Sequence, residues 1–377
     1  MRGAIVSACA PCLDERAVFG WDVGGAHVKV SRVDSAGVVT DVAQWACPLW
    51  QGIGHLQRAI DAAAARWPDA SVSRARHAVT MTGEMVDLFA DREHGVRAIV
   101  GALAGRLGDD AVFYAGPGRW LDAAQSIAQW RSVASANWLA TAQYVATRAP
   151  ACLLIDIGST TTDIVPIVGS RVVARGSTDA ARLVTGELAY HGVVRTPLCG
   201  IAHRIAFRGE IAGVMNEWFA TSADVYRLTG ELWPPHDQHP GADNGPKTVA
   251  ASCARLARTI GRDAADARED EWREFAQAWR HAQLQAIGAS FEQVCAAHPA
   301  LADAPVVGAG CGRFLAAALA RAHGRDYVDF GSFARAAADA PRDAAEWIAT
   351  CAPSVAVALL MTAASAPRRN EASTRAA

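Results

Sequence analysis

The run LLIDIGSTTTDIVPI, from Leu153 to Ile167, decides the fold. Its two ends have the composition of buried strands, whereas its middle is an acid, a glycine and a series of hydroxyl side chains, closed by a second acid. A hairpin needs only one or two turn residues, so this long polar tip requires another explanation. Amides and hydroxyls of small residues can surround a phosphate. The sequence therefore predicts a β-hairpin whose tip, Gly158, Ser159, Thr160 and Thr161, binds phosphate.

A similar hairpin lies near the start of the chain. The segment VFGWDVGGAHVKVSRVDSAGVV, residues 18–39, aligns without a gap with CLLIDIGSTTTDIVPIVGSRVV, residues 152–173. The alignment pairs Asp22 with Asp156, Gly24 with Gly158, Gly25 with Ser159 and Lys29 with Asp163. A repeat of a strand, a polar tip and a second strand indicates a duplicated lobe. Gly24 and Gly25 are accordingly predicted to form a first phosphate-binding tip.

Composition limits the partners and the compartment. The 36 lysines and arginines nearly balance the 38 acids, so no strong field would attract nucleic acid or a membrane surface, and small molecules are the expected partners. The nine cysteines are an odd number without paired metal-ligand spacing, and Cys9 and Cys12 lack a redox or zinc context. We therefore expect a cytoplasmic protein, and a homo-oligomer is compatible with the sequence.

The length of 377 residues and the repeated hairpin indicate two lobes. We expect a loose leader over 1–16, lobe I over 17–148, lobe II over 149–366 and a disordered tail over 367–377. Within the lobes, residues 56–66 predict a helix, 77–83 predict a strand that ends in a turn, and 112–116 predict another strand. Residues 305–320 predict a strand, a glycine turn and a helix. Residues 232–247, rich in proline, histidine, aspartate and glycine, predict a surface loop.

Two duplicated α/β lobes with acid-and-glycine hairpins resemble the superfamily of actin, Hsc70 and the sugar and acetate kinases, whose lobes are ribonuclease H-like. The resemblance implies that the two tips grip phosphates from opposite sides of a cleft. It also implies that the late glycine turn, Gly308, Gly310 and Gly312, contacts an adenosine-type group. Each motif alone is weak evidence, and the order of the motifs together with the repeat carries the prediction.

The two recurring acids, Asp22 and Asp156, would repel a bound phosphate unless a cation lay between them. Mg²⁺ is commonly held by carboxylates, water and phosphate oxygens, so the pattern favours a magnesium site at these aspartates. The alternative is that each aspartate only bonds local amides and stabilises its own hairpin.

Longer motifs specify a family. The segments GWDVGGAHVK, CPLWQG, HAVTMTGEMVDLF, ASANWLATA, TGELAYHGVVRTPL, ADVYRLTGEL and RLARTIGRD resemble the tetrahydromethanopterin-linked C1 transfer pathway proteins. These are short relatives of the hydantoinase/oxoprolinase group and are similar to the synthases of methylofuran biosynthesis. The resemblance implies a transferase that joins an aminomethylfuranmethyl diphosphate to tyramine or a related phenolic amine, forming an ether and releasing diphosphate. An ATP-dependent kinase or ligase is the alternative, and a nucleotide-gated binding module is a third possibility.

Five polar residues are candidates for the chemistry. Lys29, on the return strand of the first hairpin, could reach a phosphate oxygen. Arg195 could hold diphosphate bidentately, with a surface ion pair as the equal alternative. Glu84, Asp87 and Glu187 could each accept the phenol proton, although capping of a helix N-terminus would also explain Glu84 and Asp87.

Overall fold

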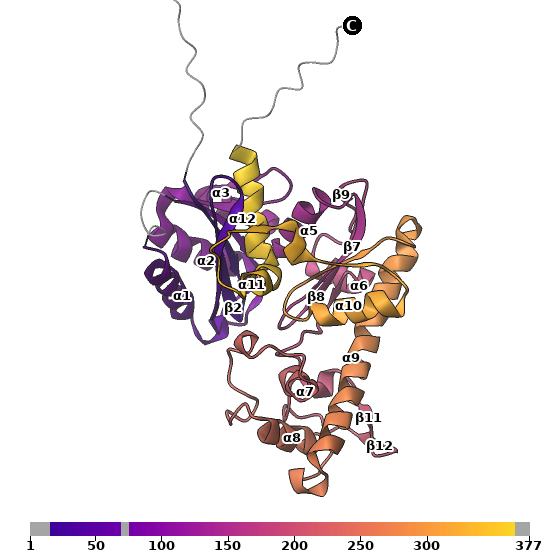
Figure 1. The fold of residues 1–377 in the computed structure, drawn as a ribbon. Coiled ribbons are helices and arrows are strands. Elements are labelled where there is room, and N and C mark those ends of the chain that lie inside the picture. The colour runs from indigo at the N-terminus through magenta and orange to yellow at the C-terminus, as the bar shows by residue number, and fades with distance from the viewer. Residues whose placement is uncertain (1–15, 69–74, 366–377) are drawn as a thin grey trace, which may run out of the picture.

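The computed structural model describes residues 16–68 and 75–365 of the chain. Two α/β lobes lie beside each other, and a smaller, mainly helical body extends from the second lobe (Figure 1). The leader predicted over 1–16, except its last residue, and the whole tail predicted over 367–377 lie outside the described residues, as do Cys9 and Cys12.

Lobe I is built on a sheet of seven strands in the order β15-β3-β2-β1-β4-β5-β6. Its strands are β1 (Val18–Val23), β2 (His27–Val33), β3 (Val38–Ala46), β4 (Arg76–Met81), β5 (Ala111–Tyr114), β6 (Trp120–Leu121) and β15 (Arg335–Ala336). The helices are α1 (Gly54–Arg66), α2 (Arg92–Leu107), α3 (Ala123–Ala128), α4 (Trp130–Val133) and α5 (Asn137–Ala146). The helix predicted at 56–66 and the strands predicted at 77–83 and 112–116 are confirmed.

Lobe II repeats the central part of this sheet. The strand order is β10-β8-β7-β13-β14, with β9 also paired to β8. These strands are β7 (Ala151–Ile157), β8 (Thr162–Val168), β9 (Arg171–Val172), β10 (Leu188–Ala189), β13 (Val306–Ala309) and β14 (Tyr327–Asp329). The helices α6 (Asp179–Thr185) and α10 (Arg313–Ala322) belong to this lobe. The predicted strand, glycine turn and helix at 305–320 are therefore confirmed as β13 and α10.

Strand pairing confirms the duplication. In each lobe the first strand pairs antiparallel with the second and parallel with a later strand: β1 with β2 and β4, and β7 with β8 and β13. The register is also equivalent, because Asp22 lies opposite Lys29 and Asp156 lies opposite Asp163. The gapless repeat in the sequence thus corresponds to two hairpins of the same geometry.

The last part of the chain returns to lobe I. The predicted boundary at 148/149 assigned this part to lobe II and is wrong for it. Strand β15 pairs with β3, and helix α12 (Ala352–Ser365), which follows α11 (Ala344–Thr350), packs against β1, β2, β4 and α5. Gly20 permits this contact, since a Cβ atom there would lie 1.9 Å from the Ser354 carbonyl oxygen. Lobe I therefore consists of residues from both ends of the chain.

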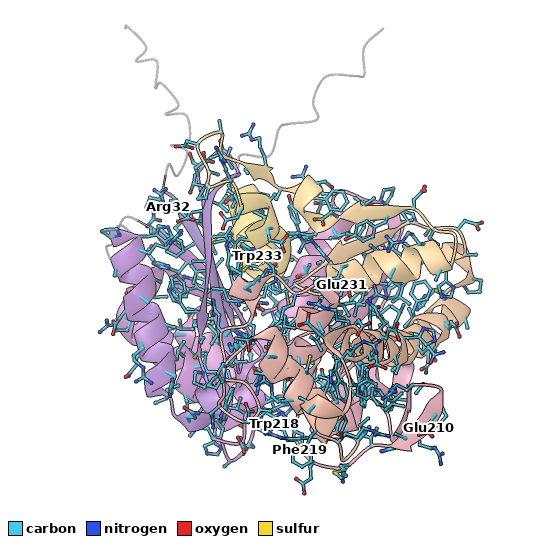
Figure 2. All side chains as sticks on the ribbon, turned by 60° about the horizontal axis from the view of Figure 1, so that its bottom comes forward. Arg32, Glu210, Trp218, Phe219, Glu231 and Trp233 are labelled. Carbon is cyan, nitrogen blue, oxygen red and sulfur yellow. The ribbon has the colours of Figure 1, made fainter. Side chains whose placement is uncertain are left out.

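The smaller body lies between β10 and β13 in sequence. It contains the hairpin β11 (Arg204–Phe207) and β12 (Glu210–Gly213), the helices α7 (Ser222–Thr229) and α8 (Val249–Arg258), and the first part of the long helix α9 (Glu269–Ala297), which runs up into lobe II (Figure 1). Side chains fill the space between its elements (Figure 2). Within the described part of the chain no single helix is long and apolar enough to cross a membrane, and only α11 with α12, bent by 90°, reaches that length and composition as a pair.

The predicted surface loop at 232–247 is partly wrong. Its backbone forms only one short helical turn, Pro234–His236, but His236 and His239 are buried. His239 Nε2 lies 2.8 Å from the Ala26 carbonyl oxygen, and Gln238 Nε2 donates to the Gln44 carbonyl oxygen at 3.0 Å. The loop therefore crosses from the smaller body to lobe I and contacts the first hairpin.

Candidate functional site

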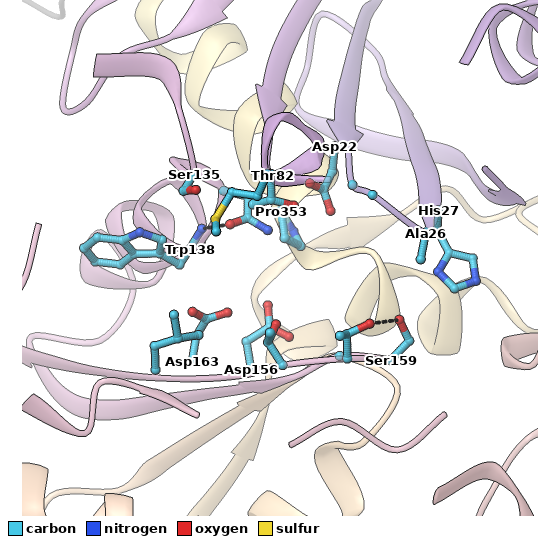
Figure 3. A pocket seen from close by; sticks show the side chains of 18 of the residues that line it. Asp22, Ala26, His27, Thr82, Ser135, Trp138, Asp156, Ser159, Asp163 and Pro353 are labelled. Atoms are coloured by element: carbon cyan, nitrogen blue, oxygen red, sulfur yellow. Dashed lines mark hydrogen bonds between the residues drawn. The ribbon is translucent and has the colours of Figure 1, made fainter. Parts of the chain in front are cut away.

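A cavity of about 400 Å³ lies between the two lobes and is lined by both hairpin tips. Asp22 points into it from lobe I, and Asp156, Ser159 and Asp163 point into it from lobe II (Figure 3). The lining includes the predicted tip residues Gly24, Gly25, Gly158, Ser159, Thr160 and Thr161, together with Lys29 and Arg195. The structure thus brings both tips and both cationic candidates to one site.

The second tip has the free donors that a phosphate site requires. The turn is closed by the Gly158 amide, which donates to the Thr161 carbonyl oxygen at 2.8 Å. The amides at 159–161 donate to no group in the described part of the chain, so they are available to an anion. Gly192 packs directly behind the tip, where a Cβ atom would lie 2.3 Å from the Thr160 nitrogen. The sequence pattern gave no indication of this supporting glycine.

The acids of the site are buried around a single lysine. Lys29 Nζ lies 3.6 Å from Asp22 Oδ2. Burial raises the pKa of Asp156 to about 7, and the nearby carboxylates of Asp163 and Asp22 also raise it, whereas Lys29 lowers it. Burial also raises the pKa of Asp22. The pKa of Lys29 stays above its ordinary value although burial opposes this, because Asp22 and other acidic groups surround it. Lys29 is therefore a charged counter-ion for the aspartates.

These two aspartates fit a divalent cation. Asp22 Oδ1 is buried and accepts no hydrogen bond of normal geometry, and Asp156 lies across the cavity with its pKa raised by burial. A cation would satisfy the unpaired oxygen and favour the ionised form of both carboxylates. The described residues contain no group of three or more His, Cys, Asp or Glu side chains arranged to hold a metal alone. Phosphate oxygens and water would have to complete the coordination.

Four further residues of the cavity were not predicted. Asp163 forms an ion pair of 2.8 Å with Arg182, whose guanidinium lies 3.9 Å from the centre of the Trp138 ring. Asp179 pairs with Arg92 of α2 at 2.6 Å, which joins the two lobes. Two sequence signals pointed to Asp163, because it is the acid that closes the second polar tip and it aligns with Lys29. Trp138 lies in the motif ASANWLATA, whereas Asp179 and Arg182 come from a segment without a recognisable motif.

Arg195 is half-buried and lines the cavity without forming an ion pair with any described carboxylate. Its guanidinium instead lies 4.4 Å from the centre of the Trp50 ring, and its backbone amide donates to the Ser159 carbonyl oxygen at 2.8 Å. The alternative of a surface ion pair is therefore wrong. Burial lowers the pKa of Arg195, and an anion in the cavity would offset the cost of that burial.

The predicted proton acceptors are not exposed to the cavity. Glu187 accepts from the amides of Arg175 and Gly176, at 2.6 and 2.8 Å, and stabilises the turn before α6. Glu84 is buried, which raises its pKa, and its Oε1 lies 2.8 Å from Ser135 Oγ. Asp87 is exposed, and the cap of α2 is Asp91. Neither Glu84 nor Glu187 lines the cavity, and this geometry corrects their assignment to catalysis.

Glu84 belongs to a buried network with Ser135 and Asp179. Ser135 Oγ lies within hydrogen-bond distance of both Glu84 Oε1 and Asp179 Oδ2, at 2.8 and 3.0 Å. A hydroxyl has one hydrogen, so it cannot donate a full hydrogen bond to both carboxyl groups. Asp179 also pairs with Arg92, and Glu84 is held in this buried network away from the cavity lining.

The late glycine turn has a packing role. A Cβ atom at Gly310 would lie 2.2 Å from the Ile157 carbonyl oxygen and 2.5 Å from Asp156 Oδ1, and one at Gly312 would lie 2.4 Å from the Ile157 side chain. At Gly308 the obstruction is Tyr327. The turn therefore supports the end of β7 and the position of Asp156. None of the three glycines lines the cavity.

Two equivalent hairpin lobes that present acids, free amides and cations to one cavity define a protein of the actin, Hsc70 and sugar-kinase type of fold. The sequence pattern of the hydantoinase/oxoprolinase family matches residues 75–337, and the chain belongs to this family.

Two relatives of this chain have a named function. The chain is 27% identical over 294 residues to the (4-{4-[2-(gamma-L-glutamylamino)ethyl]phenoxymethyl}furan-2-yl)methanamine synthase of Methanocaldococcus jannaschii, covering 78% of this chain and 86% of that protein. It is 34% identical over 120 residues to the synthase of the same name from Methanococcus vannielii, covering 32% of this chain and 54% of that protein.

Two solved structures overlay on most of the chain. A ROK family glucokinase from Streptomyces griseus, in complex with glucose and AMPPNP, has a TM-score of 0.46 and 14% identity, with 91% of this chain and 98% of that chain covered. The activator of the 2-hydroxyisocaproyl-CoA dehydratase from Clostridium difficile, with bound ADPNP, has a TM-score of 0.45 and 9% identity, with 93% and 95% covered.

Proposed function

We propose that the protein is a transferase that condenses an aminomethylfuranmethyl diphosphate with a phenolic amine, forms an ether and releases diphosphate. The supporting observation is the pair of hairpin tips that face one cavity with buried acids, unpaired amides and the cations of Lys29 and Arg195. The name of the M. jannaschii relative describes a phenoxymethyl link to a furan that bears a methanamine group. The phenol in that name carries a γ-glutamylaminoethyl group, so tyramine and its γ-glutamyl derivative are the proposed acceptors.

The chemistry places its main demand on the leaving group. The furan oxygen can stabilise positive charge on the attached methylene, so the enzyme must mainly support the departing anion. The amides at 159–161 would donate to diphosphate oxygens from lobe II, and Arg195 would add a charged donor beside them. Asp22 and Asp156 would hold Mg²⁺, which supplies additional positive charge at the phosphate oxygens when it is bound.

Lys29 has a different place in this mechanism from the one first predicted. Its ammonium lies against Asp22, so it balances the charge of the two aspartates and lies on the same side of the cavity as the first tip. A positive group there lowers the cost of holding two carboxylates close to a diphosphate. Lys29 would therefore stabilise the site before and during departure of the leaving group.

The direct test is a reaction without nucleotide. The protein would be incubated with Mg²⁺, the furan diphosphate and either tyramine or γ-glutamyltyramine, with the ether measured by mass spectrometry and diphosphate by a coupled assay. We expect equal amounts of ether and diphosphate. Diphosphate release without an ether would contradict a transferase, and a requirement for ATP consumption would indicate a kinase or ligase instead. Asp109→Asn, at an exposed position outside the cavity, is the matched control.

A further inference from the structure

A second cavity adjoins the first. It has a volume of about 450 Å³ and lies between the Leu49–Gln51 turn of lobe I, the 232–247 loop and the start of α7. Trp50 and Trp218 contribute aromatic surface to it, and Trp218, seen on the smaller body in Figure 2, is 62% exposed. Volumes of this size and a largely apolar lining with a few polar groups are typical of small-molecule sites.

Two contacts join this cavity to the phosphate cavity. Arg195 lines both, with its guanidinium over the Trp50 ring. His27 lines the first cavity and His239 lines the second, and their ring centres are 4.7 Å apart. A molecule in the second cavity would therefore have one end beside the place where diphosphate binds.

The carboxylates of the second cavity are already engaged. Asp224 accepts a hydrogen bond from Ser252 Oγ and forms ion pairs with Arg227 and Arg255, at 2.7 to 3.1 Å. Asp237 pairs with Arg227 and Lys247. These acids hold α7, α8 and the 232–247 loop together. Both carboxylates therefore have structural partners already.

His239 is differently placed. Its Nε2 lies 2.8 Å from the Ala26 carbonyl oxygen, and a carbonyl oxygen only accepts, so Nε2 must carry the hydrogen. The other ring nitrogen, Nδ1, is then an acceptor. The pKa of His239 is lowered, mainly by burial and also by the positive charges of Arg195 and Lys247. The hydrogen bond to Ala26 and the charge of Asp237 oppose this lowering only in part. The ring is therefore neutral near pH 7 and able to take a proton.

We infer that the second cavity binds the phenolic acceptor, with its ring beside Trp50 and Trp218, and that Nδ1 of His239 accepts the phenol proton. This inference rests on the transferase function proposed above. In the step, the phenol O–H bond breaks and its proton goes to Nδ1. The phenol oxygen forms a bond to the furanyl methylene, and the bond from that carbon to the diphosphate oxygen breaks. The electron pair of that bond leaves with the diphosphate.

The test uses His239→Gln, because a glutamine amide can still donate to the Ala26 carbonyl oxygen but cannot take a proton. General-base catalysis contributes about a hundredfold or more, so kcat/KM for the acceptor should fall by about that factor. The KM for the furan diphosphate should stay within about twofold. With fluorinated tyramines, whose phenols are more acidic, the deficit should shrink in steps as the phenol pKa falls.

A second variant tests the binding part separately. Trp218→Ala should raise the KM for the acceptor about tenfold with little change in kcat, because it removes aromatic contact area away from the reacting atoms. Wild-type melting temperatures in both variants would show that the fold is intact.

Three outcomes would overturn the inference. An equal loss in His239→Gln with every phenol would mean that the ring only positions other groups. If Trp218→Ala leaves the KM for the acceptor unchanged, the acceptor binds elsewhere. The same follows if Trp218→Ala changes only the KM for the furan diphosphate. Absence of any ether from the wild-type protein would instead refute the underlying transferase function.

Discussion

Asp156→Asn should stabilise the fold while removing the function of the site. The wild-type carboxyl is 8% exposed, and burial raises its pKa from 3.8 to about 7. The folded protein therefore binds this proton more tightly than the unfolded chain. A neutral amide of the same shape avoids the cost of a buried charge. The variant should lose the proposed co-binding of Mg²⁺ and diphosphate, because it lacks one of the two carboxylates.

The magnitude and the sign follow from the pKa. Below about pH 4 the group is protonated in both states and costs nothing. Between about pH 4 and 7 the unfolded chain has lost the proton and the folded protein retains it, so wild-type stability falls by about 1.4 kcal/mol per pH unit. The shift of about three units gives a total near 4 kcal/mol above pH 7. From pH 5 to pH 7 the advantage of Asp156→Asn should therefore grow by about 2 to 3 kcal/mol.

The assay is urea unfolding of both proteins at half-unit pH steps, without Mg²⁺. Asp109→Asn, at an exposed position outside the cavity, should show no pH-dependent difference from wild type and serves as the control. At pH 8, adding Mg²⁺ and diphosphate should stabilise wild type and leave Asp156→Asn nearly unchanged, because a ligand that binds only the folded state stabilises it in proportion to its affinity.

Two results would refute the reasoning about Asp156. If the difference in unfolding free energy between the two proteins is the same at pH 5 and pH 7, the carboxyl is ionised throughout and burial does not control its pKa. If Mg²⁺ and diphosphate stabilise both proteins equally, Asp156 does not take part in binding the pair.

Two further predictions concern the charge balance and the support of the tip. Lys29→Ala should lower turnover by about a hundredfold, as expected for losing a charge-stabilising group. Lys29→Arg should restore turnover only in part, because a planar guanidinium does not replace a compact ammonium 3.6 Å from Asp22. Full turnover of Lys29→Ala at saturating substrate would contradict this prediction. Gly192→Ala should weaken diphosphate binding, measured by calorimetry, about tenfold or more. The new Cβ atom would lie 2.3 Å from the Thr160 nitrogen and would have to displace the tip. Unchanged affinity would mean that the tip amides do not bind the anion.

The sequence by itself was sufficient for the two hairpins and the fold that they define. Strand composition, the small residues of each tip and the alignment of Asp22 with Asp156 are contained within about twenty consecutive residues in each lobe. Backbone pairing then reproduces the alignment, because a hairpin fixes which residues face each other across its strands. For the same reason the positions of Lys29 and Asp163 opposite these acids were accessible from sequence.

Only the tertiary structure decided which other side chains reach the cavity. Glu187 was a plausible base in the sequence, but the turn before α6 directs it to the amides of Arg175 and Gly176. His239 belongs to a segment whose composition predicted a surface loop, yet the loop crosses to lobe I and bonds Ala26, 213 positions earlier. Local pattern specifies a strand or a turn, whereas contacts over such distances depend on how whole elements pack, and that information is spread over the entire chain.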